Sequence, residues 1–248
     1  MEEVGKILNL IQSKLPNPYA TTIIALILIA IVNGEGFGYD KVLLSGIIAV
    51  IIAVGIEAIV IYMKTKKIVL SQSAAISGLI ITNIFLPGEY LLVGATSAVT
   101  IVLKTLIIWK NRPLFNPAAL GLFIMFLIYP ANEAWWGDSN ALAILIVGLI
   151  VSWRIRKLQF SIPYLITYIV LRYLQIGQPA LEFFPFFAAF IMFTEPKTTP
   201  VKDSIIGAVI GAVAVNLFLF VNMNFQIGIP SAALLGILVV NVTRILLK

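Results

Sequence analysis

The sequence predicts an all-α polytopic membrane protein with about ten membrane-spanning helices. Three observations support this fold class. Hydrophobic residues make up 60% of the 248 residues and charged residues only 11%, with a mean hydropathy of +1.05. Long apolar stretches recur along the chain between short polar or proline-containing segments. Basic residues gather in alternate connecting segments, which is the pattern that orients helices in a membrane.

Residues 1–18 precede the first apolar stretch and are polar and amphipathic. They have no short apolar core followed by a small-residue cleavage site, so we expect a cytosolic N-terminal segment rather than a cleaved signal. The apolar segments that follow are candidate helices. In chain order they are Tyr19–Val32, Val42–Met63, Ile68–Leu86, Leu91–Trp109, Pro117–Tyr129, Ala141–Trp153, Phe160–Leu174, Phe183–Phe193, Ser204–Val221 and Pro230–Leu247.

Two of these candidate helices are too short to cross a membrane. Pro117–Tyr129 spans roughly 20 Å at 1.5 Å per residue, against a hydrocarbon core of about 30 Å. Phe183–Phe193 is shorter still and contains Pro185. We therefore expect short or broken helices near the middle of the membrane, one in each half of the chain.

An internal repeat relates the two halves of the chain. Pro87 matches Pro200, and Pro117 matches Pro230, at one constant offset of 113 residues. Five membrane crossings separate the members of each pair, and because this number is odd the two halves would be inverted. We predict a single membrane domain of two inverted five-helix repeats, residues 19–129 and 130–248. The alternative is a chance similarity between apolar segments.

The basic residues predict the orientation. If the N-terminus is cytosolic, one side of the membrane carries most of them, namely Lys6, Lys14, Lys64, Lys66, Lys67, Lys110, Arg112, Arg154, Arg156, Lys157, Lys197, Lys202, Arg244 and Lys248. The other side carries Lys41 and, near a helix end, Arg172. The positive-inside rule then places both termini in the cytosol and the chain in the cytoplasmic membrane, with Trp135 and Trp136 as anchors at the outer interface.

The sequence contains neither cysteine nor histidine. Without thiolates and imidazoles the chain has no ligands for iron–sulfur clusters or His-ligated haem, and most zinc sites are excluded as well. Any redox role would therefore use an organic cofactor. The net charge of +6 does not indicate nucleic-acid binding, because the basic residues mark one side of a membrane. The expected surroundings are a lipid bilayer.

Two polar islands interrupt the apolar sequence. In the first island, residues 111–121, Asn116 has the chemistry of a helix N-cap and Pro117 that of a first helical residue. In the second island, residues 194–200, Thr199 precedes a proline in the same way. A helix start at membrane depth directs N–H groups and a positive dipole end at an anion or a substrate. A plain loop before a capped helix would have the same sequence.

Together the two islands resemble the signature of a family. Phe115-Asn116-Pro117-Ala118-Ala119 and Phe193-Thr194-Glu195-Pro196-Lys197-Thr198-Thr199-Pro200 are similar to the motif pair of RnfD and NqrB, membrane subunits of ion-translocating ferredoxin:NAD and NADH:quinone oxidoreductases. The likeness covers most of the chain from Ser71 onward, although Glu195 stands where the family more usually has Asp. The resemblance implies a ten-helix inverted-repeat fold that holds flavin, works with other membrane subunits and helps to couple electron transfer to Na⁺ or H⁺ movement. On this resemblance the candidate cofactor-binding residues are Arg112, Asn116, Thr194, Glu195, Thr198 and Thr199.

One departure from the family concerns the flavin attachment. Family members link FMN through a phosphoester to the threonine of a Ser-Gly-Ala-Thr motif, whereas this chain has Gly137-Asp138-Ser139-Asn140. Asn140 stands at the acceptor position, and an amide does not form that ester. The expectation is FMN or riboflavin bound without a covalent link, with Ser139 as the substitute acceptor if a link exists.

Three polar residues within the candidate helices are candidates for an ion pathway. Glu57 is an intramembrane carboxylate, which costs on the order of 2.5–3.5 kcal/mol to insert, unless the basic residues 64–67 draw it toward the interface. Thr82 and Asn83 are expected to face the bundle interior, where they either bond a neighbouring helix or line a pathway. Lys104, near a helix end, is expected to extend toward the interface.

These observations favour one functional hypothesis and leave two others open. The first is a membrane subunit of an ion-translocating electron-transport complex, carrying electrons through flavin without a catalytic residue of its own. The second is a stand-alone channel or transporter that uses the same scaffold for a small solute or flavin. The third is a partner-binding subunit with no site of its own.

Overall fold

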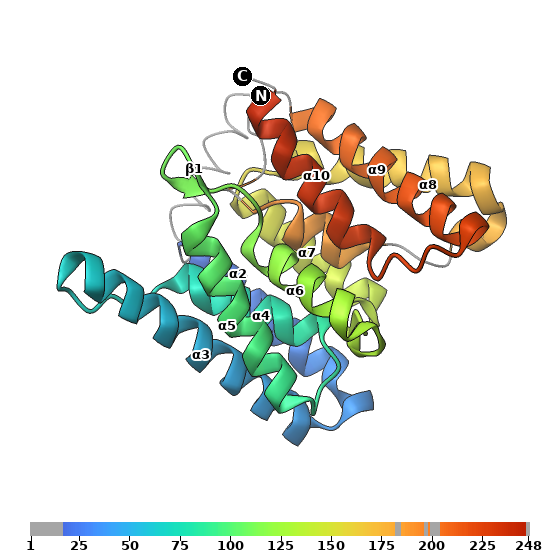
Figure 1. The fold of residues 1–248 in the computed structure, drawn as a ribbon. Helices are drawn as coiled ribbons and strands as arrows, with labels where there is room; N and C mark the ends of the chain where they lie inside the picture. Colours follow the sequence, from blue (N-terminus) through green and yellow to red (C-terminus); the bar gives the residue numbers. More distant parts are fainter. Residues whose placement is uncertain (1–16, 182–184, 196–197, 199–203, 247–248) are drawn as a thin grey trace, which may run out of the picture.

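Helices account for nearly all of the secondary structure in the computed structural model, which describes residues 17–181, 185–195, 198 and 204–246 (Figure 1). The α-helices are α2 (Pro18–Asn33), α3 (Tyr39–Thr65), α4 (Gln72–Ile84), α5 (Tyr90–Leu106), α6 (Pro117–Ile128), α7 (Ala141–Arg154), α8 (Leu158–Ile176), α9 (Ser204–Phe225) and α10 (Ala232–Leu246). The shorter elements are the 3₁₀-helices η1 (Gly34–Phe37), η2 (Pro130–Asn132), η3 (Trp136–Asp138) and η4 (Gln178–Leu181), the π-helix η5 (Ala188–Met192), and the strands β1 (Ile108–Trp109) and β2 (Arg112–Pro113).

Each of nine predicted apolar segments overlaps one α-helix, and the described part of the tenth contains η5. Local chemistry sets several of the starts. Asn17, Ser71, Asn116 and Asn140 each accept a hydrogen bond from the backbone N–H three residues later, as N-cap side chains do. The start of α6 at Pro117 therefore confirms the prediction for the first island.

One predicted helix gives way to a hairpin before its expected end. The segment predicted to run to Trp109 ends as a helix at Leu106, and Ile108 and Trp109 form β1 of a two-stranded hairpin instead. The two turn residues, Lys110 and Asn111, have positive φ angles of 49° and 61°, a conformation that turns the chain back rather than continuing a helix.

Three helical stretches are long and apolar enough to cross a membrane, namely 18–37, 39–65 and 205–225. Their outer surfaces carry large apolar side chains. In α3, Leu43 and Ile51 are each 65% exposed, which would be costly in water and is favourable against lipid. These features are those of a helical membrane protein.

The helices pack in a similar order in the two halves of the chain. In the first half, α3 contacts α4 and α5, and α5 contacts α6. In the second half, α8 contacts η5 and α9, and α9 contacts α10. The final helices of the two halves, α6 and α10, contact each other near the middle of the bundle (Figure 1).

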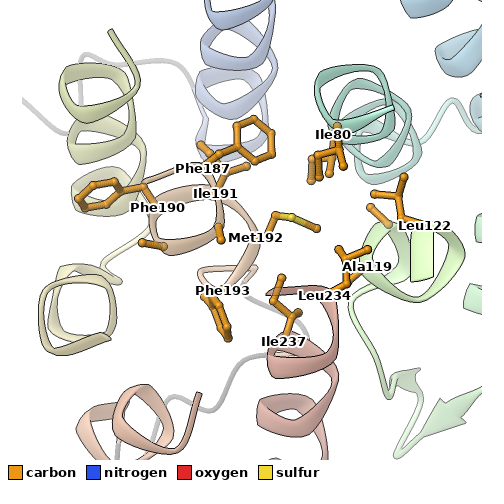
Figure 2. Close-up of a cluster of buried hydrophobic side chains, with 14 of the residues drawn as sticks. Ile80, Ala119, Leu122, Phe187, Phe190, Ile191, Met192, Phe193, Leu234 and Ile237 are labelled. Atoms are coloured by element: carbon orange, nitrogen blue, oxygen red, sulfur yellow. The ribbon is translucent and has the colours of Figure 1, made fainter. Parts of the chain in front are cut away.

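The core gathers around the short segment that contains η5. Figure 2 shows Met192 extending from this segment into the space between Ile80 of α4 and Ala119 of α6, with Leu234 of α10 close by. These side chains belong to one buried cluster in which most members are less than 5% exposed. A π-helix is uncommon and often marks a functional site, so the segment at the centre of the bundle is of interest beyond packing.

Candidate functional site

Asn116 ties the start of α6 to two elements from the second half of the chain. Its side-chain Oδ1 accepts a hydrogen bond from the N–H of Ala119 at 3.1 Å, and its Nδ2 donates to the carbonyl of Met192 at 3.0 Å. Its own backbone N–H donates to Oδ1 of Asn241 at 2.6 Å. The residue is 1% exposed, so these bonds replace water completely.

The second island meets the same network. Thr194 and Thr198 are both fully buried. Thr194 donates from Oγ1 to carbonyls of the π-helical segment, and Thr198 donates from Oγ1 to the carboxylate of Glu195. Asn241 donates from Nδ2 to the carbonyl of Thr198 at 3.3 Å while it accepts from Asn116. One asparagine of α10 therefore bridges the two islands.

A cavity of about 380 Å³ opens beside this network. Three of the predicted site residues, Asn116, Thr194 and Glu195, line it. The structure thus brings together residues from both islands at a pocket whose volume lies within the usual range of about 300–1,000 Å³ for small-ligand sites.

The electrostatics of this cavity favour an anion. The first turns of α2, α4 and α6 all contribute lining residues, so the positive dipole ends of three helices lie near the cavity. Arg154 and Arg156, from the end of α7 and the turn after it, also line the cavity, and Glu195 is the acidic residue of the lining.

A buried lysine lies next to this acidic residue. Lys157 is 3% exposed, and burial lowers its pKa to about 8, although the nearby Glu195 carboxylate opposes this shift. Lys157 thus lies near Glu195, and Arg154 and Arg156 bring two more cations to the lining of the cavity. The basic turn at residues 154–157 indicates orientation in the sequence, but the part that Arg154 and Arg156 take in lining a pocket was not predicted. Asn241 was missed too, although an asparagine within an apolar helix is itself a signal of a buried partner.

Several other predicted site residues lie elsewhere. Arg112 is exposed in the β1–β2 hairpin and lines a different pocket, so it does not stand beside Asn116 as expected. Ser139 and Asn140 lie at the start of α7, at the opposite end of that helix from Arg154. Asn140 is the N-cap of α7. Thr199 lies outside the described residues.

The polar pair in α4 faces the bundle interior as predicted. Thr82 is 2% exposed and donates to the carbonyl of Gly78, and Asn83 is fully buried and donates to the carbonyl of Leu79. Within the described part of the chain, Oδ1 of Asn83 accepts no hydrogen bond. The structure shows the pair bonding within its own helix, and an ion-pathway role remains a prediction.

Trp136 corrects one expectation about the membrane interface. It is 2% exposed, and its Nε1 donates to the carbonyls of Thr82 and Phe85 at 2.7 and 3.1 Å. It therefore packs over the end of α4, where its indole N–H satisfies carbonyls that the helix leaves without partners, rather than anchoring in lipid headgroups.

Glu57 and Lys104 correct a second expectation. The Nζ atom of Lys104 lies 2.7 Å from Oε2 of Glu57 and 3.1 Å from Oγ of Ser73, and the two charged side chains are only 6% and 14% exposed, lysine first. Lys104 does not extend to the interface, because its charge is satisfied inside the bundle. Glu57 likewise bonds Lys104 rather than the basic residues 64–67.

The comparisons with known proteins add no name to this geometry: neither a scan against protein-family models nor a search of curated proteins finds a match to the chain.

Proposed function

We propose that the chain is a membrane subunit of an ion-translocating electron-transport complex of the RnfD/NqrB kind, and that the cavity beside Asn116 binds FMN or riboflavin without a covalent link. The observation that carries this proposal is the convergence of the two islands. Asn116 and Met192, which are 76 residues apart, are joined by a hydrogen bond, and Asn116, Thr194 and Glu195 line one cavity.

The residues present fit a flavin. A reduced isoalloxazine carries negative charge, and FMN adds a phosphate; bound flavin would supply one- and two-electron transfer. Arg154 and Arg156 would hold the anionic group, and the positive dipole ends of α2, α4 and α6 would stabilise it further. The lining is otherwise largely aliphatic, with Ile76, Ile80 and Ile191 available to pack against a planar ring system.

The same proposal includes the finer architecture. Ten helices would form two inverted repeats, with α6 and the η5 segment as the short elements near the middle of the membrane. The matched packing order of the two halves supports this, as does the start of α10 two residues after Pro230, the partner of Pro117 in the repeat. The basic residues 64–67, 110–112 and 154–157 lie at the end of the bundle where α6 begins, which supports a cytosolic orientation for that end.

The test is the flavin content of the purified protein. Protein extracted in detergent is expected to show flavin absorbance, or to acquire it with added FMN, and to release all of it on denaturation. The double variant Arg154→Gln/Arg156→Gln is expected to bind FMN at least tenfold more weakly, because two charge-assisted contacts are lost. Lys66→Gln/Lys67→Gln removes the same charge from exposed residues outside the cavity and serves as the control.

Three results would contradict the proposal. A protein that stays colourless at saturating FMN has no flavin site, and flavin that remains attached after denaturation shows a covalent link. Equal loss of binding in both double variants would mean that net charge, rather than the cavity, holds the flavin.

The second candidate is a channel or transporter for a small anionic solute. The observation that favours it is the meeting of several helix starts at one cavity, an arrangement that transporters use to bind anionic substrates. Uptake of a labelled anion by liposomes that contain the colourless protein would support this candidate over the first.

A further inference from the structure

A second basic pocket, of about 210 Å³, lies between the end of α3, the end of α5 and the β1–β2 hairpin. Its lining includes three cations and one carboxylate, Lys64, Lys104, Arg112 and Glu57. Asn111 of the hairpin turn also contributes to the lining. It shares no lining residue with the cavity beside Asn116, so it is a separate feature of the molecule.

The inner part of this pocket is electrically neutral. Lys104 and Glu57 form the 2.7 Å ion pair, and both side chains are largely buried. Because their charges cancel, the pair does not by itself attract an ion. The pair does give the base of the pocket, between α3 and α5, polar atoms that a lipid headgroup can contact.

The outer part of the pocket is positive. Lys64, in the last turn of α3, and Arg112, in β2, are both exposed. Within the described residues neither forms a salt bridge. Two cations from separate elements thus face one opening without a carboxylate to neutralise them. An arginine in particular favours phosphate, since its planar guanidinium donates two parallel hydrogen bonds.

The position of the pocket along the membrane normal points to a lipid. Helix α3 has 27 residues and is therefore about 40 Å long, whereas the hydrocarbon core is about 30 Å thick. The exposed Lys64, Lys66 and Lys67 at its C-terminal end favour the headgroup region for that end, and Figure 1 shows this end of α3 projecting beyond the neighbouring helices. Beside the pocket, Val102 and Leu106 of α5 are 44% and 71% exposed and offer an apolar surface for an acyl chain.

We propose that this pocket binds the phosphate of an anionic membrane phospholipid, with Lys64 and Arg112 contacting the phosphate and α5 contacting the acyl chains. Basic pockets between membrane helices recognise anionic headgroups in this way. A dissolved phosphate would gain the same two contacts but none from Val102 and Leu106, so the lipid is the occupant that uses the whole site. The inference does not depend on flavin binding, because it concerns different residues.

The test compares lipids on the delipidated protein in detergent, with native mass spectrometry or thermal unfolding as the readout. Phosphatidylglycerol is expected to bind more tightly than phosphatidylcholine. The double variant Lys64→Gln/Arg112→Gln is expected to weaken phosphatidylglycerol binding about thirtyfold, at about 1 kcal/mol for each cation near a membrane surface. Lys41→Gln/Lys67→Gln removes the same charge from exposed residues outside the pocket and should retain the affinity.

A third variant tests the role of the ion pair, and it is expected to strengthen lipid binding rather than weaken it. Glu57→Gln keeps a hydrogen-bond acceptor for Lys104 but removes the neutralising charge, so phosphatidylglycerol should bind more tightly than to the unaltered protein. Equal binding of the two lipids, unchanged affinity in Lys64→Gln/Arg112→Gln, or weaker binding in a folded Glu57→Gln variant would each overturn the proposal. Displacement of the lipid by inorganic phosphate alone would show a site for a dissolved anion instead.

Discussion

The backbone N–H of Asn116 donates a hydrogen bond of 2.6 Å to the side chain of Asn241, which lies 125 residues later in the sequence. This bond joins the N-cap residue of α6 to the middle of α10. Because the amide of Asn241 also donates to the carbonyl of Thr198, a single side chain bonds both islands and fixes their relative position. The geometry of the candidate flavin site therefore depends on a residue that does not line it.

Replacement of Asn241 by leucine should destabilise the protein by about 1–3 kcal/mol. The substitution keeps a similar volume but leaves the buried N–H of Asn116 without an acceptor, and an unsatisfied buried group costs that amount. Thermal unfolding in detergent is the measurement. The control is Asn224→Leu, since Asn224 is exposed on α9 and its side chain donates to the carbonyl of Phe220 in the same helix. Equal stability of Asn241→Leu and the unaltered protein would contradict the assigned role.

A second prediction concerns the closest approach of α5 and α6. A Cβ atom placed on Gly121 would lie 3.0 Å from Cα of Thr100, so an alanine there requires the two helices to separate. Gly121→Ala should therefore lower the free energy of unfolding by about 1–3 kcal/mol, as overpacking does. Gly55→Ala is the matched control, because nothing lies within 4 Å of its Cβ position and alanine favours a helix by up to about 1 kcal/mol. A neutral Gly121→Ala variant would show that α5 and α6 are not in this contact.

The predictions from sequence succeeded where the determining chemistry is local. Apolar runs and the Asn116-Pro117 cap depend on neighbours within a few residues, and the structure has helices at those places. The predictions for Lys104 and Trp136 failed because each side chain finds a partner on another element, Glu57 on α3 and the carbonyls that end α4. Spacing along one helix gives no information about such partners.

In the candidate site, too, the local features were predicted and the partners from distant parts of the chain were not. The resemblance pointed to both islands, and Asn116 and Thr194 indeed line one cavity. The cations of that cavity are Arg154 and Arg156, whereas Arg112, which is much nearer in sequence to Asn116, turns away in the hairpin. Sequence proximity suggested Arg112, but the positive φ angles at Lys110 and Asn111 carry the chain in another direction.

A third prediction concerns pH. Burial raises the pKa of Asp138 to about 7 from an ordinary value of 3.8, although the N–H of Phe187 donates to its carboxylate and opposes the shift. At a pH between these two pKa values, Asp138 keeps its proton in the folded protein but has lost it in the unfolded chain. The contribution of Asp138 to the free energy of unfolding must therefore fall as pH rises from about 4 to about 7.

Asp138→Asn should remove this dependence, because asparagine keeps the acceptor for Phe187 and does not ionise. We expect the variant to gain stability relative to the unaltered protein as pH rises, with the larger difference at about pH 8 and the smaller at about pH 5. Unfolding temperatures at the two pH values are the measurement. Glu35→Gln, at an exposed position of η1, is the control. A difference between Asp138→Asn and the unaltered protein that does not change with pH would contradict the buried, proton-binding carboxylate.

The last prediction compares two losses of stability at the Glu57–Lys104 pair. One follows removal of a single charge, and the other follows replacement of both charges by apolar side chains. Lys104→Met leaves Glu57 without its cation at a position only 14% exposed, so this single variant should lose about 3 kcal/mol of stability, the lower end of the range for a broken buried pair. The double variant Glu57→Leu/Lys104→Met buries no charge and should recover to within about 1 kcal/mol of the unaltered protein, because apolar packing replaces two desolvated ions. A double-mutant cycle of unfolding free energies measures the coupling. If the two single effects simply add, the charges do not interact and the 2.7 Å pair makes no contribution to holding α3 against α5.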